Sequence, residues 1–132
     1  MKIMKISTKE KVEIVDITSE VRREVAESGV KDGLCTVFTL HTTTGIILNE
    51  YEERLMEDLK NFLEKIVPSK GSYRHNEIDS NADSHLRAIL LNPSATIPIV
   101  NGDIFLGTWQ RVLFVELDGP RTRNVLLKVV GR

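Results

Sequence analysis

The stretch T-W-Q-R-V-L-F-V-E-L-D-G-P-R-T-R-N-V-L-L-K-V-V (108–130) decides the fold of this 132-residue chain. Residues 108–117 carry the longest strand pattern of the sequence, and residues 122–130 form a strongly apolar final strand pattern. Asp118-Gly119-Pro120 between them has the composition of a tight turn. This part of the chain therefore predicts two long strands of an antiparallel β structure, joined by a turn.

Further strands are expected toward the N-terminus, where apolar residues alternate with polar ones or where β-branched residues are frequent. These segments are residues 2–8, 11–17, 34–41, 44–48 and 95–100. We expect the first two to pair with each other. Asn101-Gly102 follows the last segment and is a strong signal for a hairpin turn.

Three helices are expected between these strands. Thr18 or Ser19 can cap the first helix and Gly29 can end it, while Asn49 with Glu52 resembles the start of the second, which Pro68 ends. Asp79 or Ser80 is expected to cap the third helix. The apolar faces expected to meet the core are Leu55, Leu59, Phe62, Leu63 and Ile66 in the second helix and Leu86, Ile89 and Leu90 in the third.

The predicted fold class is α+β, with seven or eight strands in mostly antiparallel sheets packed as a sandwich and about three helices over one side or end. The length of the chain and the absence of a linker predict one domain over residues 1–132. The net charge of −1 disfavours nucleic acid as a partner, and no apolar run is long enough for a membrane span. A single cysteine, Cys35, and a start without an apolar signal segment predict a cytoplasmic protein.

Two of the three histidines bracket the segment H-N-E-I-D-S-N-A-D-S-H (75–85). Imidazoles and carboxylates grouped in this way can bind a divalent metal or transfer protons near neutral pH. The segment does not satisfy the spacing of a calcium loop, because Ser84 stands where that loop needs glycine. A set of helix caps and surface hydrogen bonds is the competing interpretation.

The third histidine opens H-T-T-T-G (41–45) at a strand junction. Hydroxyl groups and backbone donors beside an imidazole can bind an oxyanion, although threonine is also simply a good strand former. Near the C-terminus, Arg121 and Arg123 follow a turn and can grip a phosphate or carboxylate, or can form a charged hairpin tip. Trp109 can stack on a ring, but a core position is the more frequent role for such a residue.

Taken together, these clusters resemble the YjbQ-like family, which also carries the label secondary thiamine-phosphate synthase enzyme. The residues that carry the resemblance are H-T-T-T-G…N-E (41–50), H-N-E-I-D-S-N-A-D-S-H-L (75–86), I-P-I-V-N-G (97–102), L-G-T-W-Q (106–110) and E-L-D-G-P-R (116–121). They occur in the family's order and spacing, with Glu77, Ser80 and Ser84 as small departures from its usual pattern.

The resemblance implies a β-rich α+β fold in a homotrimer, with a polar pocket near a subunit boundary. It implies that His41, His75 and His85 converge and hold a divalent metal, zinc or magnesium. The catalytic residues that it suggests are Asp79, Glu116 and Arg121. The residues that it suggests for substrate binding are Thr42, Thr43, Asn49, Asn81, Thr108, Gln110 and Arg121.

The resemblance also implies a thiamine-phosphate synthase activity, which joins a pyrimidine diphosphate to a thiazole phosphate and releases pyrophosphate. The first functional hypothesis is therefore a metal-dependent enzyme that acts on a phosphorylated small metabolite. The alternative is a non-catalytic trimeric module that binds a metal or a small anion. Asp79 and Glu116 favour the enzyme, because an anion-binding module has little use for carboxylates.

Overall fold

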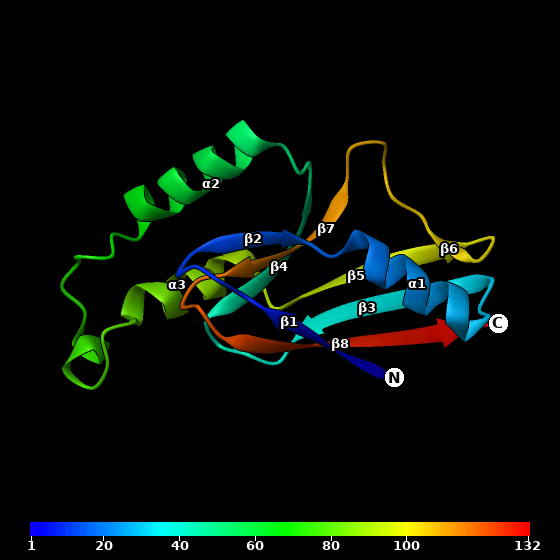
Figure 1. Ribbon diagram of the computed structural model, residues 1–132, viewed down its shortest axis with the longest axis horizontal. Helices are drawn as coiled ribbons and strands as arrows, with labels where there is room; N and C mark the ends of the chain where they lie inside the picture. Colours follow the sequence, from blue (N-terminus) through cyan, green and yellow to red (C-terminus); the bar gives the residue numbers. More distant parts are fainter.

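The computed structural model describes residues 1–132 and confirms the α+β class, with two antiparallel sheets and three α-helices (Figure 1). The five-stranded sheet has the order β1-β8-β3-β5-β6, and the three-stranded sheet has the order β2-β7-β4. The strands are β1 (Lys2–Ser7), β2 (Glu13–Asp16), β3 (Asp32–Thr39), β4 (Thr44–Asn49), β5 (Ser94–Val100), β6 (Asp103–Ile104), β7 (Arg111–Glu116) and β8 (Thr122–Gly131). The helices are α1 (Thr18–Ser28), α2 (Glu53–Ile66) and α3 (Ala82–Leu91), with a short 3₁₀ helix, η1, at Arg74–Glu77.

The two long C-terminal strands do not pair with each other, because β7 is the central strand of the small sheet and β8 is an inner strand of the large one. Residues 117–121 therefore connect two sheets and are not the tip of a hairpin. The expected pairing of residues 2–8 with 11–17 is also wrong, since β1 pairs with β8 and β2 pairs with β7. The β1–β2 and β7–β8 connections lie side by side where they pass between the sheets. The N–H of Thr8 donates to the carbonyl of Arg121, and the N–H of Gly119 donates to the carbonyl of Lys11.

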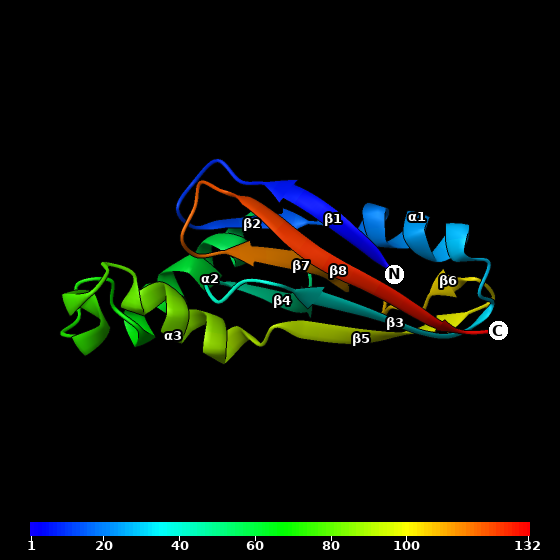
Figure 2. The same cartoon turned by 90° about the horizontal axis from the view of Figure 1, so that it is seen from below.

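The main core lies between the two sheets and under α1 (Figure 2). Phe114 and Val112 of β7 face this core, whereas Leu113 and Val115 face a second, smaller core beneath α2 and α3. Apolar layers thus cover both faces of β7, which explains why its sequence is a continuous apolar run and not an alternating one. Cys35 lies fully buried in the main core, as expected.

The turns and helix ends that the sequence predicts are present, and some helices begin a few residues later than predicted. Asn101 and Gly102 both have positive φ in the turn between β5 and β6, and Gly29 ends α1 in the left-handed conformation. Helix α2 begins later than expected, because the side chain of Glu52 caps it by accepting from the N–H groups of Arg54 and Leu55. Helix α3 begins at Ala82, after Asn81, whereas Asp79 and Ser80 precede it.

The helix faces are partly the reverse of those expected. Leu86, Ile89 and Leu90 of α3 are exposed, and Leu55, Phe62 and Ile66 of α2 are more than a third exposed. Helix α3 instead packs through a short, polar face that includes Asp83, Ser84 and Arg87. The hydroxyl of Ser84 donates to the carbonyl of Leu117, and the guanidinium of Arg87 donates to that of Val67. Periodicity identifies an apolar face, but it does not reveal whether the same chain covers that face.

Trp109 is 71 % exposed in the loop between β6 and β7, so the expected core position is wrong. Strand β7 begins at Arg111, so Trp109 precedes the strand and does not share its inward face. No helix of the structure is long and apolar enough to cross a membrane.

The core position of Phe114 gives a test of this layering. We expect Phe114→Ala to lower the free energy of unfolding by about 3–5 kcal/mol, because its ring is fully buried between the sheets. Phe105→Ala is the matched control, since that ring is 66 % exposed and its loss costs less than about 0.5 kcal/mol. Urea unfolding of both variants measures the difference, and similar losses would contradict the assignment of the core.

Candidate functional site

His41 lies in the loop that joins β3 to β4 and is held there by the first part of β8. The N–H of Leu40 donates to the carbonyl of Asn124, and the N–H of Asn124 donates to Nε2 of His41 over 2.8 Å. Because Nε2 accepts a hydrogen bond, its lone pair is occupied and the proton of the neutral ring resides on Nδ1. His41 is therefore arranged as a neutral hydrogen-bond donor.

The surroundings of His41 favour the same neutral form. Partial burial is the main cause that lowers the pKa of His41, the positive charge of Arg123 lowers it further, and the carboxylate of Glu116 opposes the change. The charge of Arg121 also acts on the ring, so all three C-terminal charged residues lie within electrostatic range of it. At neutral pH the imidazole can donate one hydrogen bond without carrying a charge.

The same loop offers three consecutive backbone donors. The N–H groups of His41, Thr42 and Thr43 take part in none of the hydrogen bonds of the chain, although the carbonyl of Thr43 accepts from the N–H of Leu117. Successive free N–H groups can bind an anion where they point the same way. We call the set made by these three N–H groups, Nδ1–H of His41 and the hydroxyl of Thr42 the 41–43 cradle.

A cavity of about 330 Å³ lies beside the cradle, between this loop and α3. Its lining residues are His41, Thr42, Thr44, His85, Ala88, Ile89 and Pro93. His85 also lines a neighbouring cavity of about 450 Å³, which includes His75 and Tyr73. The sequence-predicted histidines thus share one region of the surface, with His85 between the other two.

His75 and His85 form an edge-to-face pair, with ring centres 4.9 Å apart and planes at 79°. Two imidazoles on one tetrahedral zinc have their centres roughly 5 Å apart, because each ligating nitrogen lies about 2 Å from the metal. The same separation is that of an ordinary edge-to-face contact between two rings, so it does not by itself define a metal site. His41 does not fit as a third ligand, since Nε2 accepts from Asn124 and Nδ1 carries the proton.

The expected convergence of three histidines on one metal is thus not what a single chain provides. No group of three or more histidine, cysteine, aspartate or glutamate side chains is arranged to hold a metal ion. Two buried oxygens near the start of α3, Oδ1 of Asn81 and Oδ2 of Asp83, have no hydrogen-bond partner. They are acceptors that a donor or a cation could satisfy.

Glu116 is fully buried and its carboxylate is occupied, so it is not available to a substrate. Oε1 accepts from the hydroxyl of Thr8 (2.7 Å) and from Nε of Arg123 (2.8 Å), and Oε2 accepts from Arg123 and from the N–H of Asp118. Arg123 also donates to the hydroxyl of Thr43 over 2.8 Å. Glu116 and Arg123 have a structural role in this arrangement, because their network holds the loop that carries Thr43.

Burial raises the pKa of Glu116, but the hydrogen bonds from Arg123, Thr8 and the backbone of Asp118 outweigh it and leave the pKa below its ordinary value. The sequence does not single out Thr8, and it indicates Arg123 only as part of a fork that can grip an anion, so it does not predict the ion pair of Arg123 with Glu116. The only sequence signal for Arg123 was its place two residues after Arg121 in the same fork.

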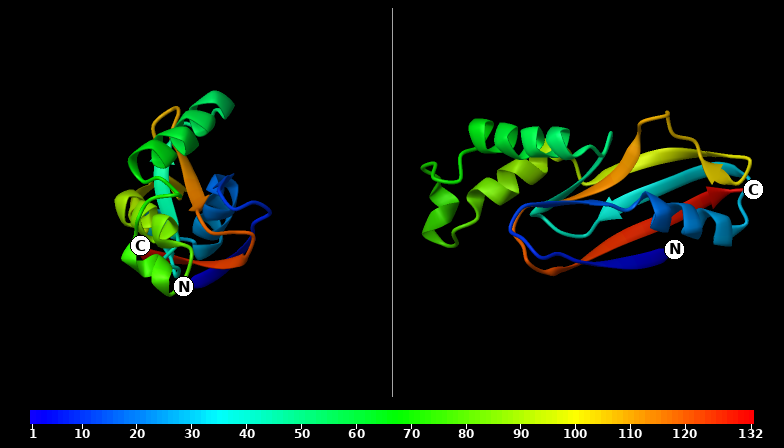
Figure 3. Two further views of the ribbon diagram at one scale, coloured as in Figure 1. Left: turned by 90° about the vertical axis from the view of Figure 1, so that its left-hand side faces the viewer. Right: turned by 45° about the horizontal axis from the view of Figure 1, so that its top comes forward.

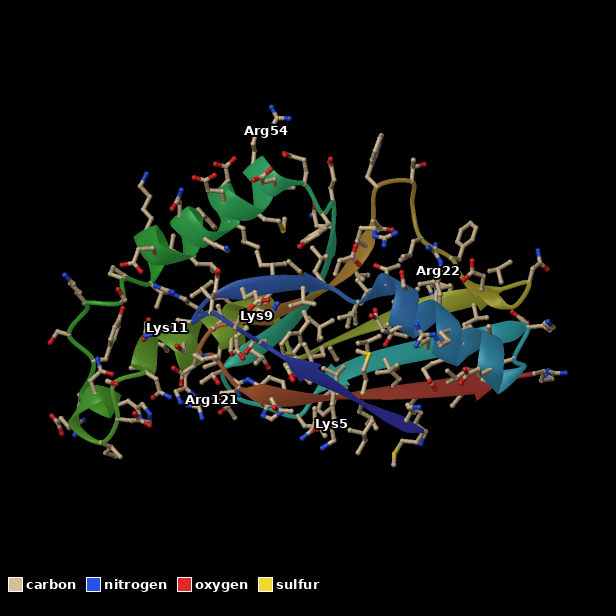
Figure 4. The ribbon with its side chains drawn as sticks, viewed as in Figure 1. Lys5, Lys9, Lys11, Arg22, Arg54 and Arg121 are labelled. Carbon is tan, nitrogen blue, oxygen red and sulfur yellow. The ribbon has the colours of Figure 1, made fainter.

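Arg121 lies at the crossing connections, where its carbonyl accepts from the N–H of Thr8 (Figure 4). Its Nε donates to the carbonyl of Asp118 over 2.9 Å, and its side chain remains more than half exposed. Asn81 reaches the same turn, because its Nδ2 donates to Oδ2 of Asp118 over 2.9 Å. Arg121 and Asn81 therefore meet at Asp118, whereas Asp79 is exposed and accepts only from the N–H of Ser80.

Three expected substrate-binding residues lie outside this region. Asn49 ends β4 and accepts from the N–H of Glu50, and Gln110 accepts from the N–H of Gly107 in the β6–β7 loop. Thr108 is exposed in the same loop. Figure 1 shows this loop far along the molecule from α3, so a single chain does not bring Thr108 and Gln110 to the cradle.

The fold and the site define a class of small α+β proteins in which two crossed antiparallel sheets carry a histidine-lined cavity beside a free backbone loop. The chain belongs to the family of UPF0047 proteins, YjbQ-like, whose model matches residues 2–132. It is 50 % identical to a UPF0047 protein of Archaeoglobus fulgidus over 95 % of this chain and 97 % of that protein. It is 49 % identical to one of Methanothermobacter thermautotrophicus, over 96 % and 89 %.

Solved structures are similar over almost the whole chain. A YbjQ-like protein of unknown function from Sulfolobus solfataricus has a TM-score of 0.97 and 39 % identity, covering 99 % of this chain and 96 % of that one. A hypothetical protein from Aeropyrum pernix has a TM-score of 0.96 at the same identity, covering 99 % and 98 %. These comparisons establish the family and the fold.

The buried carboxylate gives a prediction about acid stability. Because the pKa of Glu116 is lower in the folded chain than in the unfolded one, its contribution is complete above about pH 4.3 and is lost as the pH falls through the folded value. We expect Glu116→Gln to cost about 3–5 kcal/mol at pH 7, since it breaks a buried ion pair, and to lose less of its stability than wild type on acidification. Urea unfolding at pH 7 and pH 3 measures both effects.

Glu57→Gln is the control for that experiment, because Glu57 is exposed and makes no hydrogen bond or ion pair. Its cost is expected to stay below about 0.5 kcal/mol. Equal losses in the two variants would show that Glu116 does not hold the structure together.

His41 gives a second prediction. Its lowered pKa means that the unfolded chain takes up the proton first, so the stability that neutral His41 contributes is complete well above pH 6.5 and decreases as the pH falls below that value. Nuclear magnetic resonance titration is expected to give a midpoint below 6.5, with the neutral ring protonated on Nδ1. A midpoint above 6.5, or a proton on Nε2, would contradict the hydrogen bond from Asn124.

Proposed function

We propose that the protein acts on a small phosphorylated metabolite, whose phosphate binds in the 41–43 cradle. The observation that carries the proposal is the run of three free N–H groups beside a neutral, donating imidazole. Hydrogen bonds from backbone N–H groups to an ionised phosphate are stronger than those between neutral partners. A neutral histidine adds a hydrogen-bond donor there and carries no charge of its own.

Arg121 supplies the positive charge that the cradle lacks. The turn at Asp118 anchors one edge of its guanidinium, through the bonds to the carbonyl and carboxylate of that residue. The remaining donors are exposed, and the positive charge of Arg121 contributes to the lowered pKa of His41. A partly anchored guanidinium can bind a phosphate with two parallel hydrogen bonds at little further cost in side-chain entropy.

The reaction class that we propose is a thiamine-phosphate synthase-like transfer. In such a transfer the bond from a pyrimidine methylene carbon to a diphosphate oxygen breaks, the electron pair leaves with pyrophosphate, and the thiazole nitrogen forms the new bond to that carbon. The cradle and Arg121 would stabilise the charge that develops on the leaving pyrophosphate. A divalent metal held by His75 and His85 would supply further positive charge at the same place.

A non-catalytic module that binds a metal or a small anion is the second candidate, and one observation favours it. The two carboxylates that suggested catalysis are not aimed at the cavity, because Glu116 is buried in its ion pair and Asp79 lies on the surface. Binding of a phosphate to the cradle needs neither of them. The two candidates differ in turnover and not in the residues that bind.

We also propose that the chain forms a homotrimer. The outer face of the five-stranded sheet has no covering layer and carries apolar side chains that include Leu34, Phe38 and Val130, each more than a third exposed. Leu86, Ile89 and Leu90 of α3 are exposed beside the cavity. Apolar surface of this extent is typical of chains that associate.

The proposal predicts how pyrophosphate binds. We expect Arg121→Ala to weaken the binding of pyrophosphate by about 1.5–3 kcal/mol, because a hydrogen bond to a charged group is lost. Thr42→Val is expected to weaken it by a smaller amount, since one neutral hydroxyl is removed. Isothermal titration calorimetry of pyrophosphate into the metal-loaded protein measures both.

Arg54→Ala is the matched control, because Arg54 is exposed at the start of α2 and points away from the body of the protein (Figure 4). Metal analysis of the same preparations, extended to the histidine variants, separates the roles of the histidines: His75→Ala and His85→Ala should lower metal content, and His41→Ala should not. Unchanged pyrophosphate affinity in both Arg121→Ala and Thr42→Val would rule out the cradle as a phosphate site. Binding without turnover of the two phosphorylated substrates would favour the non-catalytic module.

A further inference from the structure

One side of α2 carries an apolar stripe that nothing in the chain covers. Helix α2 rests on the small sheet through Met56 and Leu63, and lies at the outside of the molecule (Figure 3). Beside this contact, Leu55 is 37 % exposed, Phe62 is 56 % exposed and Ile66 is 46 % exposed. The stripe forms a shallow hollow that only residues of α2 line.

The spacing of the stripe is that of a helix–helix seam. Leu55, Leu59, Phe62 and Ile66 follow one another at intervals of four, three and four residues. This is the alternation of the a and d positions in a heptad repeat, which turns a narrow apolar edge toward a second helix. Leu59 is half-buried and also packs against the second core, so the other three supply most of the exposed apolar surface. The positions on one flank of the seam, Met56 and Leu63, are used by the chain's own core, so only a helix approaching from outside can cover the stripe.

The seam is complementary to itself about a two-fold axis. Residues 55 and 66, and residues 59 and 62, are equidistant from a point midway between residues 60 and 61. An antiparallel partner helix therefore places Leu55 against the partner's Ile66 and Leu59 against the partner's Phe62. Such pairing of like surfaces is the property of a two-fold interface.

The charges on the free flank agree with the antiparallel arrangement. Asp58 and Lys65 precede two members of the seam, Leu59 and Ile66, and neither makes an ion pair within the chain. In antiparallel helices these flanking positions face each other, which sets Asp58 beside the partner's Lys65 and the reverse. A parallel pair would bring each of them to the flank that Met56 and Leu63 already fill.

We propose that α2 is a docking surface for a second copy of this chain, which packs its own α2 antiparallel across the stripe. One helix pair buries less surface than the roughly 1,200–2,000 Å² of stable interfaces, so the pairing is concentration-dependent. The interface is separate from the cradle and from the outer face of the large sheet. Pairing through α2 therefore doubles the number of chains in the assembly that those other surfaces form, for example from three to six.

The test is the mass of the assembly in solution. Analytical ultracentrifugation of the full chain from micromolar to millimolar concentration should show the mass rise to an even multiple of 14.9 kDa. Phe62→Asp should halve the mass that the wild type reaches, whereas Phe105→Asp, at a similarly exposed ring, should leave it unchanged. An odd multiple throughout, or a mass that Phe62→Asp does not alter, would overturn the proposal.

A charge exchange tests the antiparallel register. Lys65→Asp places two like charges together at both ends of the seam and should weaken the doubling, because each aspartate then faces another. Adding Asp58→Lys restores opposite charges at both places and should restore the wild-type doubling. If the double variant associates no better than Lys65→Asp alone, the helices do not meet in this register and the proposal fails.

Discussion

The ion pair between Glu116 and Arg123 is the interaction on which the rest of the structure depends. Its two members end β7 and begin β8, on either side of the connection between the sheets. Thr8 joins the pair from the other crossing connection, and Thr43 joins it from the loop that carries His41. A buried charge pair is costly unless its hydrogen bonds are complete, and here every added partner belongs to a different segment. The network therefore holds both crossings and the 41–43 cradle in one arrangement.

The sequence predicts the positions of the helices and strands in this fold better than it predicts which strands pair with each other. The turn at Asn101-Gly102, the end of α1 at Gly29 and the run of strands all follow from local rules, because each depends on a few neighbouring residues. The pairing of β1 with β8 and of β2 with β7 does not, since nothing local distinguishes a hairpin from a crossing between sheets. The burial of Phe114 and the exposure of Phe62 depend in the same way on which layers come to lie together.

For the candidate site, the sequence identified the residue types and the region but not each role. His41, His75 and His85 do lie around two adjoining cavities that share His85. The donor role of His41 depends on the backbone N–H of Asn124, which no side-chain pattern can predict. Arg123 and Arg121 are two residues apart in the same fork, yet one faces the interior and the other faces water, because Arg123 lies within β8 whereas Arg121 precedes the strand in the connection between the sheets.

The places of β7 and β8 in the sheets have a consequence for synthesis of the protein. Strand β7 is the middle of the small sheet, and β8 joins β1 to the rest of the large one, yet both follow every other strand in the chain. A nascent chain that has left the ribosome without them possesses β1, β2, β3 and β4 but has no strand to which three of these can bind. Folding must then wait for residues 111–131, so β1, β2 and β4 stay unpaired until that segment has been synthesised. Their protection during that interval falls to chaperones or to the speed of the final step.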